Sequence, residues 1–256
     1  MLTDSSLPTA TGLTAQQVLQ FHETGWLGPF PAMTPQEMAP IREHVLASVL
    51  TTPGPNRGKT EHMRHMDDRV VFDLVSRPAI LASIRSILGN DLLLWASNFW
   101  LKQPGGAEIP WHQDGNYWPL EPVINLTAWI ALDRVTPENA CLEIIPGSHK
   151  STIPHVKAAA EHAFPTMADP GAFDPSQKVQ LPMEPGEFVL FNERTLHHSE
   201  ANHSRLRRLA IGPRFTVPIV RVSPTGPLWP DHACILVSGE DRMGFNPLTA
   251  APPMLP

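Results

Sequence analysis

Hydrophobic residues in the first third of the chain recur at the spacing of amphipathic helices. In residues 35–50, apolar side chains recur every three or four positions, at Met38, Ile41, Val45 and Val49. Two of the helical stretches begin at a threonine that is followed three residues later by Gln or Glu, the pattern of a capping box. The sequence therefore predicts helices over residues 15–23, 35–50 and 78–88, the last of which stops at Gly89.

Beyond Gly89 the apolar runs shorten to the length of strands. They are separated by turn sequences rich in Pro and Gly, which favours a sandwich or barrel of seven or eight short strands. We interpret the chain as one domain with an N-terminal helical part (1–89), a β core (90–222) and a C-terminal tail (223–256). The predicted strands cover residues 92–101, 109–112, 123–132, 142–145, 178–181, 188–191 and 209–217.

Two segments interrupt this pattern. Residues 51–68 are rich in Pro, Gly and charge, and we interpret them as a solvated surface loop. Residues 150–176 separate two strands, with a small helix predicted at 156–163 and a proline-rich loop. Because this insert is too long for a plain connection, we expect it to cover a site. The first loop carries a basic tip formed by Arg57, Lys59, His62, Arg64 and His65.

Composition and charge narrow the class of protein. The 256 residues are 42% hydrophobic and carry a net charge of −6, so the chain has enough apolar residues for a core and is a poor partner for nucleic acid. Two cysteines without C-x-x-C spacing predict a reduced protein rather than a disulfide scaffold. With no signal peptide and no long apolar run, we expect a cytoplasmic protein that does not span a membrane. The oligomeric state is left open.

Candidate chemistry lies among the histidines. A histidine and an acidic residue two positions later on a strand point to the same side, so such a pair can bind one metal ion. Only His112 and Asp114 directly follow a predicted strand, although a hydrogen-bonded pair at a strand end is the alternative there. The same spacing occurs in two other pairs, His65 with Asp67 and His198 with Glu200. For His65 and Asp67, which lie in loop 51–68, we expect a surface or capping role.

A third ligand should come from a later strand. Three histidines follow the strand at 188–191, namely His197, His198 and His203. Adjacent residues on a strand face opposite sides, so the pattern leaves the choice between the first two open. The helix-borne H-E-x-x-H motif of zinc hydrolases is absent from the sequence, which makes that class the weaker hypothesis.

Several short motifs follow one another in the β part of the sequence. They are Trp111-His-Gln-Asp114, Trp129-Ile-Ala-Leu-Asp133, Pro137-Glu-Asn-Ala-Cys-Leu142, Ile145-Pro-Gly-Ser-His149 and His197-x-Ser199-x-x-Asn202, followed by Arg208. Their order resembles the phytanoyl-CoA dioxygenase family of non-haem iron, 2-oxoglutarate-dependent oxygenases. The resemblance extends over about residues 92–215, and no single fragment is specific alone.

The resemblance implies a fold and a set of site residues. The fold is a mainly β double-stranded β-helix, or cupin-like jelly roll, with packed N-terminal helices. Fe(II) would be bound by His112, Asp114 and His197, and His198 would face away from it. Arg208 would bind the distal carboxylate of 2-oxoglutarate through a forked, charge-assisted pair, and Arg207 would point to the opposite face. The resemblance also places Ser199, Gln113 and Trp129 at positions where family members line the cosubstrate pocket.

The implied function is oxidation of a C–H bond of a small molecule, most simply hydroxylation, with O₂ as the oxidant and decarboxylation of 2-oxoglutarate to succinate. An aspartate at position 114 argues against halogenation, because related halogenating enzymes have a small residue there. We expect the rim of the substrate cavity to be formed by the basic tip, the insert and the tail, which includes Trp229, His232 and Met243. If the basic tip faces the iron, we expect an anionic substrate. The alternative is a jelly-roll protein that binds or isomerises a small molecule without oxygenase activity.

Overall fold

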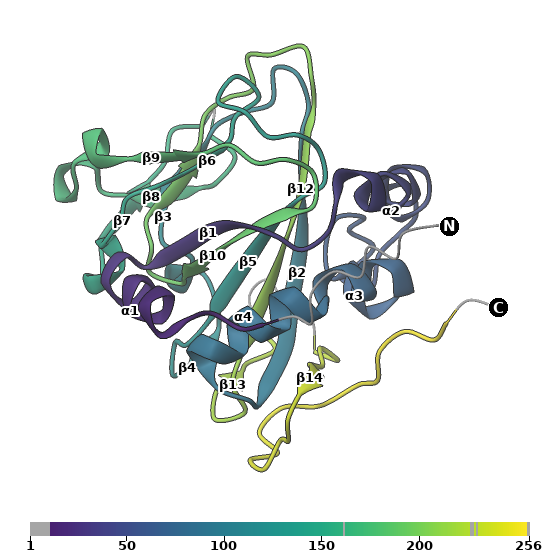
Figure 1. Cartoon of the computed structure of the whole chain (residues 1–256). Helices are drawn as coiled ribbons and strands as arrows, with labels where there is room; N and C mark the ends of the chain where they lie inside the picture. The colour runs from purple at the N-terminus through teal and green to yellow at the C-terminus, as the bar shows by residue number, and fades with distance from the viewer. Residues whose placement is uncertain (1–10, 161, 226–227, 229, 255–256) are drawn as a thin grey trace.

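Two antiparallel sheets form the body of the protein (Figure 1). The computed structural model describes residues 11–160, 162–225, 228 and 230–254. The larger sheet has the order β1-β10-β5-β12-β2-β14 and the smaller has the order β3-β11-β6-β9. Strands of the larger sheet are β1 (Trp26–Pro31), β2 (Leu92–Lys102), β5 (Leu126–Ala131), β10 (Glu187–Asn192), β12 (Arg208–Thr216) and β14 (Ile235–Ser238). Strands of the smaller sheet are β3 (Ile109–His112), β6 (Leu142–Ile144), β9 (Val179–Leu181) and β11 (His197–Ser199). The predicted mainly β jelly roll is confirmed.

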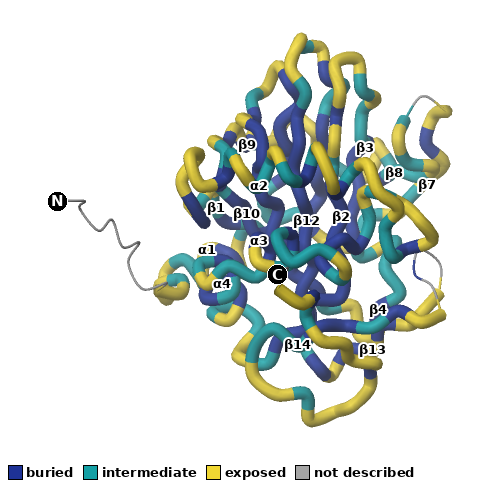
Figure 2. Tube along the Cα trace, turned by 90° about the vertical axis from the view of Figure 1, so that its right-hand side faces the viewer, coloured by how far each residue is buried: buried dark blue, intermediate teal, exposed yellow. Residues whose placement is uncertain are grey.

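Alternation along the central strands divides the interior into two layers. In β12, Leu209 and Ile211 belong to the core between the large sheet and the helices. Ala210, between them, belongs to a second core that includes residues of both sheets, such as Ile144 of β6. Since successive side chains of a strand point to opposite faces, residues 208, 210, 212 and 214 share the face toward the smaller sheet. Figure 2 shows these buried strands in dark blue, with the exposed residues mostly in the loops.

In the described residues, four α-helices accompany the larger sheet, and three of them match the predicted positions. They are α1 (Ala15–Thr24), α2 (Pro35–Ala47), α3 (Arg69–Val75) and α4 (Pro78–Leu88). Both capping boxes form, at Thr14 and Thr34. The second helix is shorter than predicted, because the chain turns at Ser48 into a short 3₁₀ helix, Val49–Thr51. None of the helices in the described ranges has both the length and the apolar character needed to cross a bilayer.

All seven predicted strand runs coincide with strands, but several strands were not predicted. The first, β1, contains two prolines and pairs only with β10, which fits the tolerance of edge strands for proline. The C-terminal tail contributes β14, which pairs with β2. The two-residue strands β4 (Leu120–Glu121) and β13 (Arg221–Val222) pair with each other and form a small separate sheet.

The helix predicted in the insert is wrong. Its first residues belong to β7 (His155–Lys157), which pairs with β8 (Thr166–Ala168) in a hairpin. The alanine-rich sequence after Lys157 favours a helix locally. Backbone hydrogen bonds across the hairpin, such as Ala158 N–H to Pro165 O at 3.0 Å, override that preference.

The basic loop is a surface feature over most of residues 51–62, as its composition suggests, but residues 63–65 at its end are buried. Arg64 is 4% exposed, and its guanidinium donates to the carbonyl oxygens of Val49, Thr52 and Thr60 as well as to Asp67. His65 is fully buried. Because these partners occupy the guanidinium of Arg64, we expect a charge reversal there to act on folding.

Burial of His65 makes stability depend on pH. Its Nδ1 lies 2.7 Å from Ser97 Oγ, and burial, followed by the influence of His232, lowers the pKa of His65 from 6.5 to about 3. Between pH 6.5 and 3 the unfolded chain therefore takes up a proton that the folded protein does not. Stability from this group is present above pH 6.5 and is lost as the pH falls.

We expect the free energy of unfolding of the metal-free protein to fall on acidification from pH 7 to pH 5, with His65 contributing about 2 kcal/mol of the loss. Urea unfolding at both pH values measures the loss. In the His65→Gln variant, which keeps a polar partner for Ser97, the loss should be smaller by that amount. An identical loss in both proteins would contradict the assignment.

Candidate metal centre

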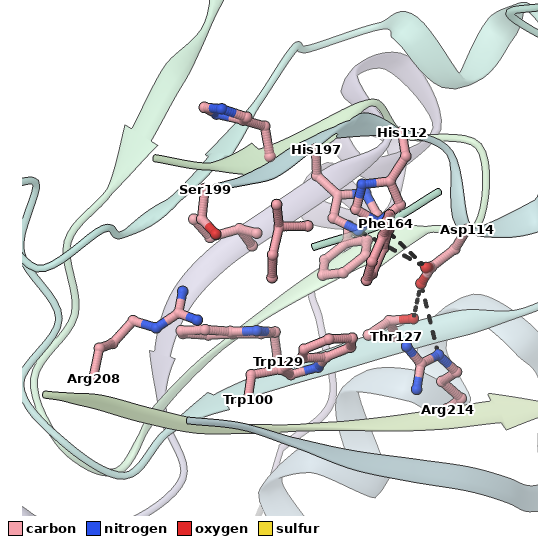
Figure 3. Close-up of a pocket in the computed structure, with 14 residues that line it drawn as sticks. Trp100, His112, Asp114, Thr127, Trp129, Phe164, His197, Ser199, Arg208 and Arg214 are labelled. Atoms are coloured by element: carbon pink, nitrogen blue, oxygen red, sulfur yellow. Dashed lines mark hydrogen bonds and ion pairs between the residues drawn. The ribbon is translucent and has the colours of Figure 1, made fainter. Parts of the chain in front are cut away.

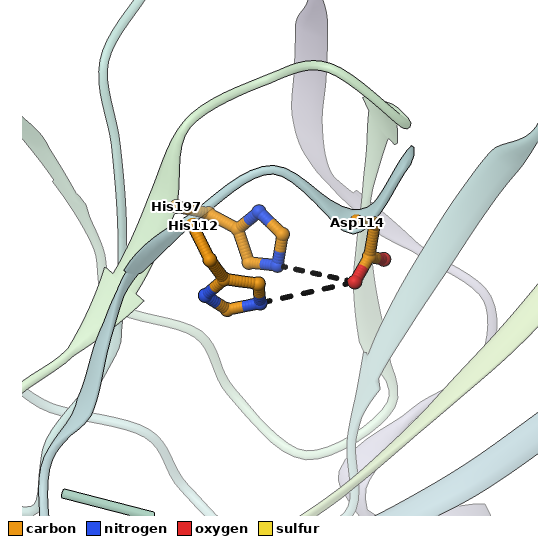
Figure 4. Close-up of side chains that lie close together, drawn as sticks. All are labelled: His112, Asp114 and His197. Carbon is orange, nitrogen blue, oxygen red and sulfur yellow. Dashed lines mark ion pairs between the residues drawn. The ribbon is translucent and has the colours of Figure 1, made fainter. Parts of the chain in front are cut away.

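The candidate metal ligands meet because two strands of the smaller sheet pair in one register. His112 is the last residue of β3, and His197 is the first residue of β11. In the antiparallel pairing these two residues lie directly opposite each other, and their ring centroids are 4.1 Å apart. Asp114 opens the short 3₁₀ turn that follows β3, Asp114–Asn116. Figure 4 shows both rings directed toward its carboxylate.

The three side chains present ligand atoms to a common point. Asp114 Oδ1 lies 3.8 Å from Nε2 of His112 and 3.9 Å from Nε2 of His197. The Nδ1 atoms are 2.7 Å from the carbonyl oxygen of Pro110 and 2.9 Å from that of Thr195, respectively. Because a carbonyl oxygen only accepts, each Nδ1 carries the proton and each Nε2 presents its lone pair to the site.

The electrostatics favour a divalent cation at this point. Burial lowers the pKa of His112 to about 3 and also lowers the pKa of His197, so both imidazoles are neutral at pH 7. Burial alone would raise the pKa of Asp114, but the nearby guanidinium of Arg214 and the two histidines hold it below its ordinary value. Two neutral imidazoles and one carboxylate on a single face are the donor set of non-haem Fe(II) oxygenases. The residues fit Fe(II).

His198 faces away from this point, which resolves the choice that the sequence pattern left open. Its Nδ1 is 3.0 Å from Glu143 Oε2 and its Nε2 is 3.1 Å from Glu108 Oε1. Its ring stacks on Trp111 with the centroids 4.8 Å apart. Glu108, His198 and Glu200 also bring ligand atoms together, but both nitrogens of this histidine already have carboxylate partners.

Arg208 lies in the same cavity as the metal ligands (Figure 3). It is 2% exposed, its guanidinium lies 5.3 Å from the Trp129 ring, and Nη1 donates to Ala140 O at 2.9 Å. Its Nε has no hydrogen-bond partner among the described residues. Arg207, by contrast, points to the other face and binds Asp133. A buried cation with a free donor, aimed into a cavity, is suited to an anionic ligand.

Comparisons with known proteins agree with this geometry. Residues 21–210 match the family model described as phytanoyl-CoA dioxygenase. The chain belongs to the phytanoyl-CoA dioxygenase family. It is 30% identical over 203 residues to a probable alpha-ketoglutarate-dependent hypophosphite dioxygenase from Stutzerimonas stutzeri, covering 74% of this chain and 69% of that protein. The chain spans about half to two thirds of the length of the curated relatives it matches. These relatives carry names such as alpha-ketoglutarate-dependent hypophosphite dioxygenase and phytanoyl-CoA dioxygenase.

Solved structures share the fold of this phytanoyl-CoA dioxygenase family member. The non-heme monooxygenase ThoJ in its apo form has a TM-score of 0.74 at 24% identity and covers 92% of this chain and 88% of its own. CytC3 with Fe(II) and alpha-ketoglutarate has a TM-score of 0.73 at 23% identity, with 94% of both chains covered. The alpha-ketoglutarate-dependent epimerase SnoN from nogalamycin biosynthesis has a TM-score of 0.66 at 21% identity, covering 82% of this chain and 85% of its own.

Of the three residues implied as further cosubstrate contacts, two line the metal cavity and one does not. Ser199 and Trp129 line the metal cavity. Gln113 does not, since its amide donates to Ser151 O at 2.8 Å and Arg194 O at 2.6 Å. It also accepts from the backbone N–H of Ile153. The expected contact of Gln113 with the cosubstrate is therefore corrected. Because it lies between His112 and Asp114 in the chain, its side chain points away from the cavity, and it connects the insert to the end of β3.

The expected rim of the cavity is confirmed only in part. Phe164 of the insert lies over the metal ligands, with its ring 4.9 Å from that of His112. His62 of the basic loop lines an adjoining cavity of about 470 Å³, which shares Arg208 with the metal cavity. From the tail, Trp229 is outside the described residues, His232 is bonded to Trp95 O, and Met243 is exposed.

Two buried cations near the metal cavity were not predicted. Lys102 is 5% exposed and donates to Ser199 Oγ at 2.8 Å, and it lies opposite Arg208 in the β2–β12 pairing. Burial and the guanidinium of Arg208 lower the pKa of Lys102 to about 7. Arg214 lies six residues beyond Arg208 on β12. Because residues an even number of positions apart on a strand share a face, the sequence could have predicted that Arg214 lies on the same face as Arg208. No pattern in the sequence predicts the contact of Lys102 with Ser199.

Adjacent histidines allow a matched test of the metal centre. We expect His197→Gln to weaken Co(II) binding by more than about 100-fold, because it removes a direct ligand. His198→Gln should keep metal affinity within a few-fold of the unsubstituted protein. It should instead lower the free energy of unfolding by about 1–3 kcal/mol, since buried Glu143 loses a partner. Calorimetric titration and urea unfolding measure both effects, and equal losses of metal affinity would contradict the assignment.

Proposed function

We propose that this phytanoyl-CoA dioxygenase family member hydroxylates a C–H bond of a small, anionic molecule while 2-oxoglutarate is converted to succinate and CO₂. The observation that carries the proposal is the convergence of His112, Asp114 and His197 in one cavity with buried Arg208. A protein that only binds or isomerises a small molecule has no need for that arginine beside the ligands. Its placement therefore supports the oxygenase over that alternative.

Each residue has a separate task in this proposal. His112, Asp114 and His197 would hold Fe(II), which supplies the activation of O₂ and of the substrate C–H bond. Three ligands on one face leave positions open for 2-oxoglutarate and O₂. Arg208 would bind the distal carboxylate of 2-oxoglutarate through its fork, against the ring of Trp129. Lys102 donates to the hydroxyl oxygen of Ser199 and so occupies one of its lone pairs, which leaves the hydroxyl proton free to donate to the same carboxylate.

The insert would exclude water from the reaction. Tyr117 follows the metal-binding turn, and its hydroxyl donates to Thr166 O of β8 at 2.9 Å. This contact holds the hairpin, and with it Phe164, against the ligands. The free volume in the metal cavity is about 30 Å³, so substrate entry requires aromatic side chains such as this phenylalanine to move. The protein would thereby present one substrate carbon and shield it from solvent.

Charge in the adjoining cavity supports an anionic substrate. Arg208 and Lys102 line it as basic residues, together with His62, whose pKa is lowered by burial, and Glu61 as the acidic residue of the set. An acid group of the substrate placed there would lie near the metal cavity, since the two cavities share Arg208 and Trp100. The names of relatives that act on hypophosphite or in nogalamycin biosynthesis make a small acid or a natural product intermediate a reasonable starting point.

Two buried free thiols, Cys141 and Cys234, fit a cytoplasmic location.

Hydrogen abstraction need not end in hydroxylation. Among the proteins of the same fold, SnoN is titled an epimerase and SnoK a carbocyclase. We favour hydroxylation as the simplest outcome, and Asp114, a carboxylate ligand, keeps halide from the position it occupies. The mass of the product distinguishes these fates, because hydroxylation adds one oxygen, desaturation or ring closure removes two hydrogens, and epimerisation leaves the mass unchanged.

The direct test supplies the purified protein with Fe(II), ascorbate, 2-oxoglutarate and a panel of small acids and natural product intermediates. We expect succinate to form in amounts matched by a product of altered mass or configuration, measured by mass spectrometry and chromatography. His112→Ala should abolish both. Undiminished succinate formation in that variant would overturn the ligand assignment. Absence of turnover across a broad panel, with Fe(II) and 2-oxoglutarate demonstrably unbound, would favour the binding protein.

The role of Lys102 has its own test. We expect Lys102→Met to weaken anaerobic binding of 2-oxoglutarate to the Fe(II)-loaded protein by about tenfold, because the Ser199 hydroxyl loses the partner that orients it. Spectroscopic titration gives the dissociation constant. Lys157→Met, at an exposed lysine of β7, is the matched control and should bind 2-oxoglutarate like the unsubstituted protein. If both variants bind equally well, Lys102 has no part in the cosubstrate site.

A further inference from the structure

A second buried arginine lies on the other side of the metal ligands from Arg208. Arg214 is 2% exposed and belongs to the same face of β12, because the two positions are an even number of residues apart. Its guanidinium carbon lies 4.3 Å from the centre of the Trp118 ring, and Nη1 donates to Gly212 O at 3.3 Å. A buried cation is costly unless a charged partner compensates it.

That partner is the metal ligand Asp114. The Nε atom of Arg214 lies 3.7 Å from Asp114 Oδ2 and has no hydrogen-bond partner within bonding distance among the described residues. No other acidic side chain in the described part of the chain forms an ion pair with Arg214. The Nε edge of the guanidinium therefore faces this one carboxylate, while Nη1 donates to the carbonyl oxygen of Gly212.

The two oxygens of Asp114 face different groups. Oδ1 faces the two histidine Nε2 atoms, at 3.8 and 3.9 Å. Oδ2 faces away from them, toward Thr127 Oγ1 at 3.5 Å and Arg214 Nε at 3.7 Å, as the dashed lines in Figure 3 show. Thr127 is itself fixed by Asn125, whose amide donates to its hydroxyl at 3.1 Å. One oxygen of the carboxylate thus faces the metal position, and the other faces the buried side chains of Thr127 and Arg214.

We propose that Arg214, together with Thr127, is a positioning residue that holds Oδ2 of Asp114 so that only Oδ1 is presented to the metal. The inference rests on the proposed function, since it concerns a ligand of that metal centre. A carboxylate that coordinated through both oxygens would occupy a position needed by 2-oxoglutarate or O₂. Outer hydrogen-bond partners of this kind orient metal ligands and support metal affinity.

Charge and positioning predict opposite outcomes for loss of Arg214. If the guanidinium acted only through its positive charge, it would repel a divalent cation, and its removal would strengthen metal binding. If it positions Asp114, its removal frees the carboxylate to rotate and weakens metal binding. The sign of the change therefore separates the two roles.

The experiment titrates the metal-free protein with Co(II) alone, followed by calorimetry and by the visible absorption bands that report coordination number. We expect Arg214→Gln to weaken Co(II) binding by about 10–100-fold and to change those bands. Thr127→Val should weaken binding by several-fold. Arg214→Lys, which keeps the charge and one donor, should recover part of the loss. Binding by Arg214→Gln that is as tight as in the unsubstituted protein, or tighter, would overturn the proposal.

The control is Arg207→Gln, on the opposite face of the same strand, where the guanidinium binds Asp133. Its Co(II) affinity should match that of the unsubstituted protein. If Arg214→Gln does not fold, as judged by circular dichroism, Thr127→Val and Arg214→Lys decide the question, and unchanged affinity and absorption bands in both would overturn the proposal. Failure of the unsubstituted protein to bind Co(II) at all would instead contradict the metal centre of the proposed function.

Discussion

The antiparallel pairing of β3 with β11 is the constraint on which the site depends. It places His197 opposite His112, two residues far apart in the chain, and so creates a pair of adjacent imidazoles. A shift of this register by one residue would place His198 opposite His112 in place of His197. It would also remove the ring of His198 from the other face, where Glu108 and Glu143 now hold it. The carboxylate contacts of His198 therefore help to define the metal centre without touching it.

The larger sheet supplies the opposite wall of the cavity through the same alternation. On β12 the odd positions 209 and 211 pack against the helices, while Arg208 and Arg214 point inward. On β5, Thr127 and Trp129 likewise face the cavity, while Ala128 and Ile130 belong to the helical core. Packing of the helices against one face thus fixes which side chains reach the chemistry on the other.

Buried charge is unevenly distributed around the metal ligands, and this distribution bears on function. Arg208 and Lys102 lie on one side and Arg214 on the other, while Asp114 is the carboxylate that faces the metal position. A divalent ion would add further positive charge. The site is thus prepared for anions, which agrees with a dicarboxylic cosubstrate and supports the proposal of an acidic substrate.

Local patterns in the sequence determined the helices with capping boxes and the seven main strands. Through the family motifs they also singled out the three candidate ligands and Arg208, which the structure brings into one cavity. They were wrong where long-range contacts outweigh local preference, as in the insert hairpin and in the loop whose Arg64 is buried among carbonyl oxygens. The tertiary structure alone decided that Gln113 turns from the cavity, that Lys102 meets Ser199 and that Arg214 meets Asp114. The physical reason is that a sequence pattern fixes which face of an element a side chain occupies, whereas its partner depends on the register and packing of distant strands.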